Sequence, residues 1–269
     1  MADNFVDNAA DIDPGSGHAA GDNLYFQSGA TAATTNLNKS GLAAGGYAQV
    51  AVAFGWTADI GTAASPLRAE ISSGASARLL YSAGGGRMYY RPNGNTDLCD
   101  LLRNVGPGSR HLYLVTGGTV TVAELSAAKT TINGAVTATT IRVSNTANVF
   151  ILDDSSTDPT TLDIGGGTVT TERGATTVEQ RAGQANWDAG TNTIGTYNLD
   201  GGTCLLEESG TITTLNWKAG AFDVSQLQRP LTITTANIWK TSVDNGSLVT
   251  ILNHPLVTIT TTNWIMDAA

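Results

Sequence analysis

The feature that most constrains this chain is a short pattern that recurs from residue 112 onward. Each copy has an alternating strand, a glycine pair and a second alternating strand, as in Leu112–Leu114 followed by Gly117–Val122. The pattern returns at Leu162–Val169 and Tyr197–Cys204, and a degenerate copy spans Leu215–Phe222. Because glycine permits sharp bends and strand side chains alternate between two faces, each copy predicts two short strands joined by a tight turn.

The spacing of these copies predicts the fold. One apolar residue near the start of a strand in each coil serves as an anchor, and successive anchors are separated by 21, 16, 19 and 18 residues. This period is too short for a propeller blade, and the fixed Leu and Asn ladder of a leucine-rich repeat is absent. We therefore predict an all-β chain, a single-stranded right-handed parallel β-helix (β-solenoid) with coils of about 18–21 residues. The anchors are Ile141, Leu162, Val178, Tyr197 and Leu215.

Stacked coils place equivalent residues above one another at about 4.8 Å. Alternation then predicts one inward column of Val120, Val169, Cys204 and Phe222, with threonine facing outward and glycine at the bends. Cys204 stands at a valine position, and Cys99 is surrounded by leucines. We expect both to be buried, inert thiols rather than parts of a disulfide framework.

Composition agrees with this fold and excludes several functional classes. The chain has 39 Thr and 31 Gly but only 14% charged residues, which argues against long amphipathic helices. No apolar run approaches the roughly 20 residues of a membrane span, and the N-terminus does not resemble a secretory signal. The net charge of −9 argues against nucleic acid as a partner. Three histidines far apart in sequence make a histidine-rich metal site unexpected.

Charge and threonine content divide the chain into three predicted parts. Residues 1–22 are acidic and lack periodicity, so we expect an extended N-terminal arm that orders against a neighbouring subunit, with a disordered tail as the alternative. Residues 23–110 should form irregular first coils and a cap, and residues 111–269 a regular β-solenoid with a C-terminal cap. The candidate partner-binding residues of the arm are Asp3, Phe5, Val6, Asp7, Asp11 and Asp13.

Short strands are expected in the irregular part, and an apolar layer is expected at the C-terminus, where it caps the core or meets a neighbour. The predicted strands are Asp22–Phe26, Gln49–Phe54, Leu67–Ile71, Arg78–Tyr81 and Arg87–Tyr90. The predicted apolar layer contains Ile251, Leu256, Val257, Ile259 and Ile265.

A search for catalytic, cofactor or metal residues finds none that converge. Residues 153–158 form an acidic cluster without the spacing of a calcium loop, and Glu207–Glu208 is expected at a solvated bend. Among the other acids, only Glu172 and Asp188 share the same offset from their anchors, while Glu179 and Asp200 do not. Gly84–Gly86 lacks the Lys-Ser/Thr of a phosphate loop. We therefore expect no enzyme and no cofactor.

The tryptophans bear on an alternative function. Trp56, Trp187, Trp217, Trp239 and Trp264 could bind sugars if they lined one exposed face, but core or capping positions are expected. An exposed groove with two carboxylates about 5 to 10 Å apart beside aromatic residues would favour glycoside hydrolysis.

Three segments, Gly117–Val122, Thr211–Trp217 and Ala219–Asp223, resemble those of short β-solenoid virion proteins of tailed bacteriophages. The resemblance extends over residues 22–260 and implies a structural protein, either a head-decoration or a tail-appendage component. It implies attachment to the major capsid protein or another lattice protein on the outer head surface, as a homo-oligomer that is commonly a trimer. No catalytic residues come with it. The alternatives are a carbohydrate-binding or carbohydrate-cleaving tailspike and a bacterial surface solenoid, which the missing signal peptide and membrane anchor weaken.

Overall fold

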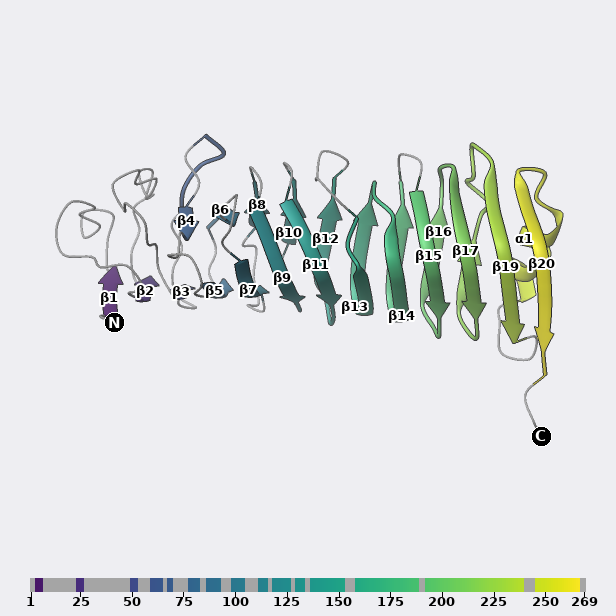
Figure 1. Ribbon diagram of the computed structural model, residues 1–269, viewed down its shortest axis with the longest axis horizontal. Helices are drawn as coiled ribbons and strands as arrows, with labels where there is room; N and C mark the ends of the chain where they lie inside the picture. Colours follow the sequence, from purple (N-terminus) through teal and green to yellow (C-terminus); the bar gives the residue numbers. More distant parts are fainter. Residues whose placement is uncertain are drawn as a thin grey trace. The chain divides into compact units, whose positions relative to one another are not determined.

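The computed structural model shows parallel β-strands stacked as a β-solenoid, with one helix in the part of the chain that it describes (Figure 1). The predicted all-β, parallel solenoid is therefore confirmed. The chain divides into two compact units, Met1–Thr139 with Asp154–Thr157, and Thr140–Asp153 with Asp158–Ala269. The described residues are 3–6, 23–26, 49–52, 59–64, 67–69, 77–82, 86–92, 98–104, 111–115, 118–126, 129–133, 136–152, 158–188, 192–239 and 245–266.

The first unit contains two series of strands that pair in parallel. The members of the first series are β1 (Asp3–Val6), β2 (Asn23–Phe26), β3 (Gln49–Val52), β5 (Ala77–Ser82), β7 (Leu98–Asn104) and β9 (Gly118–Leu125). Those of the second are β4 (Leu67–Ala69), β6 (Met88–Pro92), β8 (His111–Leu114) and β10 (Lys129–Ile132). The strands predicted between residues 22 and 90 are all present, with bounds that differ by three residues or fewer.

The second unit repeats this construction, and two of its strands bend to serve both series. The first series contains the end of β11 (Val136–Val143), the starts of β13 (Thr161–Thr171) and β14 (Ala175–Trp187), β15 (Asn192–Leu199), β17 (Gly210–Trp217), β19 (Leu231–Trp239) and β20 (Val257–Ile265). The second contains β12 (Asn148–Ile151), the ends of β13 and β14, β16 (Thr203–Leu206) and β18 (Ala221–Asp223).

The predicted repeat register is confirmed in the second unit. Each anchor is aligned with the next across neighbouring strands, from Ile141 through to Leu215. All five anchor side chains are fully buried. Hydrophobic burial of one residue per coil at the same position therefore fixes the register, because a shift by one residue would expose the whole set.

The predicted inward column is confirmed for three of its four members. Val169, Cys204 and Phe222 are buried and belong to one column, which Ala185 completes between the first two. The prediction is wrong for Val120, which is buried but registers with Cys99 in the first unit. A glycine pair permits a bend before either strand series, so the motif alone does not identify which bend it occupies.

The helix α1 (Asn245–Asn253) was not expected from composition. It packs against β18 and β20, and its residues Leu248 and Ile251 are buried. Their i, i+3 spacing places both on one helix face. Ile251, which was predicted to belong to an apolar layer that caps the core or meets a neighbour, is buried and lies in this helix.

Two glycines at the bends are required by both conformation and space. Gly202 and Gly220 have φ of +81°, a region that side chains other than glycine rarely adopt. A Cβ on Gly202 would lie 2.5 Å from the carbonyl oxygen of Gly183, and one on Gly220 would lie 2.5 Å from that of Gly202. The glycine column therefore lets successive bends stack directly.

Replacing Gly202 with alanine should lower the free energy of unfolding by about 2–3 kcal/mol, because it adds left-handed backbone strain to a clash with the preceding coil. Urea unfolding followed by circular dichroism measures this. The matched control is Gly165→Ala, whose Cβ would meet its nearest atom, the carbonyl oxygen of Val143, at an ordinary 3.7 Å. Equal unfolding midpoints for the two variants would contradict this role of Gly202.

Candidate functional site

The candidate arm residues fall into two groups. Asp3, Phe5 and Val6 lie in β1, which pairs in parallel and in register with Asn23–Phe26. Part of the segment expected to be an arm is thus a strand paired within its own chain. The remaining candidates, Asp7, Asp11 and Asp13, lie outside the described residues.

An asparagine ladder runs along the outward face of the second unit. Asn198, Asn216, Asn237 and Asn263 occupy one register column on successive strands β15, β17, β19 and β20. Each Nδ2 donates a hydrogen bond to Oδ1 of the preceding asparagine, at 2.7 Å, 2.7 Å and 2.8 Å in chain order. An amide can donate to one coil and accept from the next, so identical side chains satisfy one another at the rung spacing.

The ladder begins at a carboxylate. Nδ2 of Asn198 donates to Oε1 of Glu179, 2.7 Å away, in the preceding coil. An ionised carboxylate only accepts hydrogen bonds, so Glu179 sets the direction in which every amide of the ladder points. The sequence analysis missed this ladder. The signal that could have found it is an asparagine directly after each of the inward residues Tyr197, Leu215, Ala236 and Thr262.

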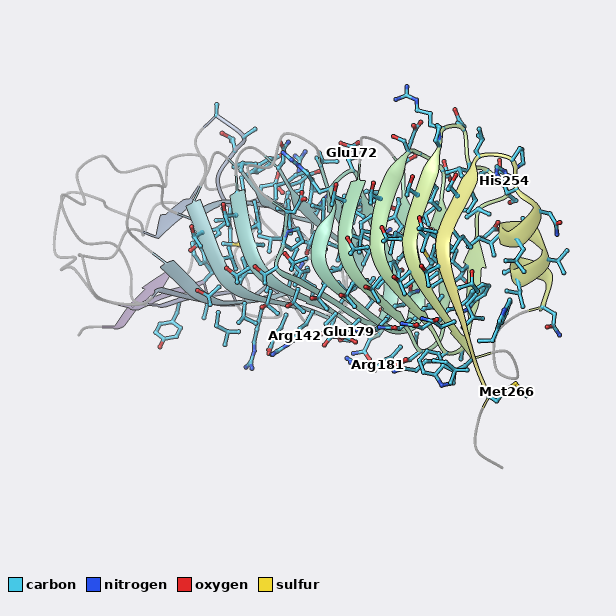
Figure 2. All side chains as sticks on the ribbon, turned by 45° about the vertical axis from the view of Figure 1, so that its right-hand side comes forward. Arg142, Glu172, Glu179, Arg181, His254 and Met266 are labelled. Carbon is cyan, nitrogen blue, oxygen red and sulfur yellow. The ribbon has the colours of Figure 1, made fainter. Side chains whose placement is uncertain are left out.

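Charged residues extend the same column beyond the ladder. Arg142, Asp163 and Glu179 are in register on β11, β13 and β14, so their backbones are about 4.8 Å apart. Asp163 also forms a hydrogen-bonded ion pair with Arg181, which raises the pKa of that guanidinium. Figure 2 shows Arg142, Glu179 and Arg181 along one side of the unit, apart from Glu172.

The pair Asp163 and Glu179 meets one condition for glycoside hydrolysis, which is two outward carboxylates on neighbouring strands. Both carboxylates already have partners, Arg181 for Asp163 and Asn198 for Glu179. Their outward neighbours two positions away along the strands are Thr161, Gly165, Thr177 and Arg181, and none of these is aromatic. The arrangement is therefore suited to joining coils, and it lacks the aromatic platform that was the second condition.

A second set of acids lies where the shorter strands end. Glu172, Asp188 and Glu207 each directly follow a registered residue of β13, β14 or β16, so they occupy equivalent places on consecutive coils. The shared offset predicted for Glu172 and Asp188 is confirmed, and Glu207 joins them. Glu208 lies at a bend, as predicted, and pairs with Arg229 at 3.3 Å.

The other acids considered from sequence form isolated ion pairs. Asp200 pairs with Lys218 at 2.9 Å, and Asp158 lies 3.9 Å from Arg173. Asp153 and Asp154, the other acids of the predicted cluster, lie outside the described residues. Exposed pairs of this kind contribute little to stability.

The first unit carries an aromatic stack that the sequence analysis did not identify. The rings of Tyr89 and Tyr113 are stacked with centroids 4.6 Å apart, and the ring of His111 lies 3.8 Å from that of Tyr113. Nearby, Arg87 and Asp59 form an ion pair at 2.7 Å. Because the rings stack on one another, these contacts occupy faces that a sugar would need for its own stacking.

His111 is half-buried, and this burial, with a smaller contribution from the charge of Lys129, lowers the pKa of its imidazole to about 4. Its Nε2 lies 2.7 Å from Oγ1 of Thr131. The neutral ring is therefore the form that fits the stack at neutral pH.

Two tryptophans are core residues, as predicted. Trp187 and Trp217 are fully buried, whereas Trp264 is 47% exposed. The ring of Trp239 lies under the ammonium of Lys218, 5.7 Å from its centroid. Trp56 lies outside the described residues. The described tryptophans therefore do not line one exposed face.

Cys204 is confirmed as a buried thiol, and burial raises its pKa to about 12. The hydroxyl of Tyr197 donates to Oε1 of Gln180 at 2.5 Å, and Nε2 of Gln180 donates to the carbonyl oxygen of Thr203 at 2.9 Å. This buried network satisfies polar groups inside the core. The side chain of Cys99 is not described.

Within the described ranges, no three His, Cys, Asp or Glu side chains are grouped so that they could hold a metal ion. The helix of the described chain is not long and apolar enough to cross a membrane. The chain matches no protein-family model, no curated protein and no solved structure.

The ladder predicts a specific loss of stability. Asn216→Ala removes two amide hydrogen bonds and leaves the facing groups of Asn198 and Asn237 without them, so the free energy of unfolding should fall by about 1–2 kcal/mol. Urea unfolding measures it. The control is Asn186→Ala, which removes a hydrogen bond from Gln184 of the same strand and a 3.5 Å contact to Thr170 but none of the ladder, and it should cost less. The ladder would have no stabilising role if both variants lost the same amount.

The lowered pKa of His111 predicts a pH dependence. Folding favours the neutral ring, so its contribution to stability is present above the ordinary pKa of 6.5 and is lost as pH falls toward about 4. Because the side chain is half-exposed, we expect on the order of 1 kcal/mol after screening. Thermal melts from pH 7 to 4 should show a smaller loss in His111→Gln than in the wild type. His18 and His254 are present in both proteins and contribute equally to both. Melting temperatures that fall by the same amount with pH in the two proteins would therefore contradict the prediction.

Proposed function

We propose that this protein is a structural component of an assembled particle rather than a catalyst. The ladder from Glu179 to Asn263 carries this proposal, because it uses the outward face of five successive strands to hold coils together. A surface of this kind makes a stiff scaffold. The paired state of Asp163 and Glu179 supports the same interpretation.

The particle that we propose is the virion of a tailed bacteriophage. Support comes from the resemblance of Gly117–Val122, Thr211–Trp217 and Ala219–Asp223 to short solenoid virion proteins. In this proposal the chain decorates the outer surface of the head, bound to the major capsid protein as a symmetric oligomer, with the trimer favoured by the resemblance.

The acidic N-terminal segment supplies a means of attachment in this proposal. Asp3 lies in the paired strand β1, whereas Asp7, Asp11 and Asp13 follow that strand in the sequence. Five negative charges and no positive charge within residues 1–38 suit a basic patch on the lattice protein.

A second function, carbohydrate cleavage or binding by a tailspike-type solenoid, is favoured by one observation. Asp163 and Glu179 are outward carboxylates in register on adjacent strands. The burial of Trp187 and Trp217 argues against it, because buried rings cannot contact a sugar, and the stacking of Tyr89 on Tyr113 occupies one face of each of these rings.

Mass spectrometry and cryo-electron microscopy of gradient-purified phage particles test the virion proposal. We expect the chain in a fixed ratio to the major capsid protein and as density on the head surface. Density on the tail rather than the head, with release of reducing sugars from host polysaccharide that Glu179→Gln abolishes, would instead establish the tailspike function. Absence of the chain from purified particles would contradict the virion proposal.

Attachment through the acidic segment has a separate test. Particles lacking the chain are incubated with the triple variant Asp7→Asn, Asp11→Asn and Asp13→Asn, which keeps β1 intact. Its occupancy should fall at least tenfold at low salt. The control triple variant Glu172→Gln, Asp188→Asn and Glu207→Gln removes three charges elsewhere and should bind normally. Equal occupancy of the two variants would exclude attachment through these aspartates.

A further inference from the structure

The last strand of the second unit has one edge without a strand partner among the described residues. β15, β17 and β19 each register with a strand on both sides, whereas β20 registers with β19 alone. Its other edge presents a row of backbone N–H and C=O groups, which is a template for pairing with another strand.

This edge lacks the features that usually prevent such pairing. Residues 245–266 contain no Lys, Arg, Asp or Glu, and the one proline, Pro255, precedes the strand. Edge strands of monomeric proteins are commonly protected by charged side chains, by proline within the strand or by a covering segment. The sequence of β20 has neither kind of protective residue.

The core is also open at this end. Trp264 is in register with Ile238, so it occupies an inward position, yet it is 47% exposed while Ile238 is fully buried. The large apolar side chains that are exposed in the described chain all belong to this end, namely Val249, Leu252, Trp264 and Met266. Terminal coils of stable solenoids normally present a polar outer face.

The helix α1 does not close this gap. Its buried residues Leu248 and Ile251 pack where α1 meets β18 and β20, while Val249 and Leu252 on the same helix are exposed. Figure 1 shows α1 beside β20, whose strand runs past the helix. One strand series thus ends at a helix, and the other ends at the edge of β20.

The asparagine ladder ends in the same place. Asn263 donates to Asn237, in the direction shared by all members of the ladder. In each earlier asparagine, Oδ1 accepts from the following coil, so Oδ1 of Asn263 holds the equivalent acceptor position for one further strand. The terminal rung can therefore continue the ladder with a donor from a partner.

We propose that a second copy of this chain covers this end, with the two β20 strands paired antiparallel about a two-fold axis. Charge permits a second copy here, because residues 245–266 contain no Lys, Arg, Asp or Glu, so this contact brings no charged side chains of the two chains together, although each chain has a net charge of −9. A two-fold contact buries the same apolar patch on both copies and closes on itself.

The proposed pairing has a defined centre. Antiparallel pairing that places inward residues opposite inward residues is centred between Thr260 and Thr261, so that Val257 lies opposite Trp264 and Thr258 opposite Asn263 of the other copy. Directly opposed residues have Cβ atoms about 4.5–5.5 Å apart. The proposal does not depend on the virion function, because it concerns the isolated chain in solution.

Light scattering coupled to size-exclusion chromatography tests the proposal on the full chain. The wild-type mass should be twice that of the Trp264→Glu and Thr261→Lys variants, and the dissociation constant should rise at least tenfold in both. Thr261 is exposed, so its variant should retain the wild-type melting temperature even if Trp264→Glu does not fold. Thr213→Glu, which alters an exposed threonine of β17, is the control and should keep the wild-type mass.

Disulfide trapping tests the two-fold geometry. Under mild oxidation, Thr261→Cys should give a covalent dimer, whereas Thr213→Cys and the wild type with its two native cysteines should not. A wild-type mass of one chain would overturn the proposal. It would equally be overturned by an oligomer whose mass is the same in Thr261→Lys, or by filaments that grow with concentration and show head-to-tail addition.

Discussion

The structure depends on one interaction, the in-register hydrogen bonding of parallel strands from successive coils. It holds each coil about 4.8 Å from the next and brings equivalent residues together. The buried sequence from Ile141 to Leu215 is one such column, and the stacked bends at Gly183, Gly202 and Gly220 are another. A substitution in any column therefore alters contacts with the neighbouring coils on both sides.

Stacking like on like favours some side chains and penalises others. An asparagine can satisfy its own copy because it carries both a donor and an acceptor, which explains the ladder ending at Asn263. Like charges at the same spacing repel, and the adjacent carboxylates Asp163 and Glu179 each have a compensating partner, Arg181 for Asp163 and Asn198 for Glu179, while Arg142 precedes Asp163 in the column. The acids Glu172, Asp188 and Glu207 sit instead at bends near solvent, where screening is stronger.

The same constraint separates the sides of the solenoid from its end. Along the sides of the second unit, outward groups are occupied by neighbouring coils, as Asp163 is by Arg181 and Glu179 by Asn198. At β20 the stacking of the described strands stops. The backbone groups of its edge, the partly exposed ring of Trp264 and the Oδ1 acceptor of Asn263 are then at the end of the solenoid. A scaffold held together by its sides and joined through its end is consistent with the structural role proposed above.

The sequence by itself determined the fold class, the coil length and the register of the second unit. It could do so because glycine bends and one inward apolar residue per coil are local patterns that recur every 16–21 residues, visible at Leu162, Val178 and Tyr197. It did not assign Val120 to its column, because either bend of a coil accepts a glycine pair. The helix α1 was also missed, since its two buried residues form too short a signal.

Only the tertiary structure decided which surface residues act together. Asn198 and Asn216 are separated by a whole coil in sequence, and the stack of Tyr89, Tyr113 and His111 likewise joins residues of different coils. Such contacts depend on which outward residues the register places side by side and on how their side chains are then oriented. For the same reason, composition could show that the chain is rich in threonine and poor in charge, but only the stacked coils showed that its uncharged residues meet at one open edge.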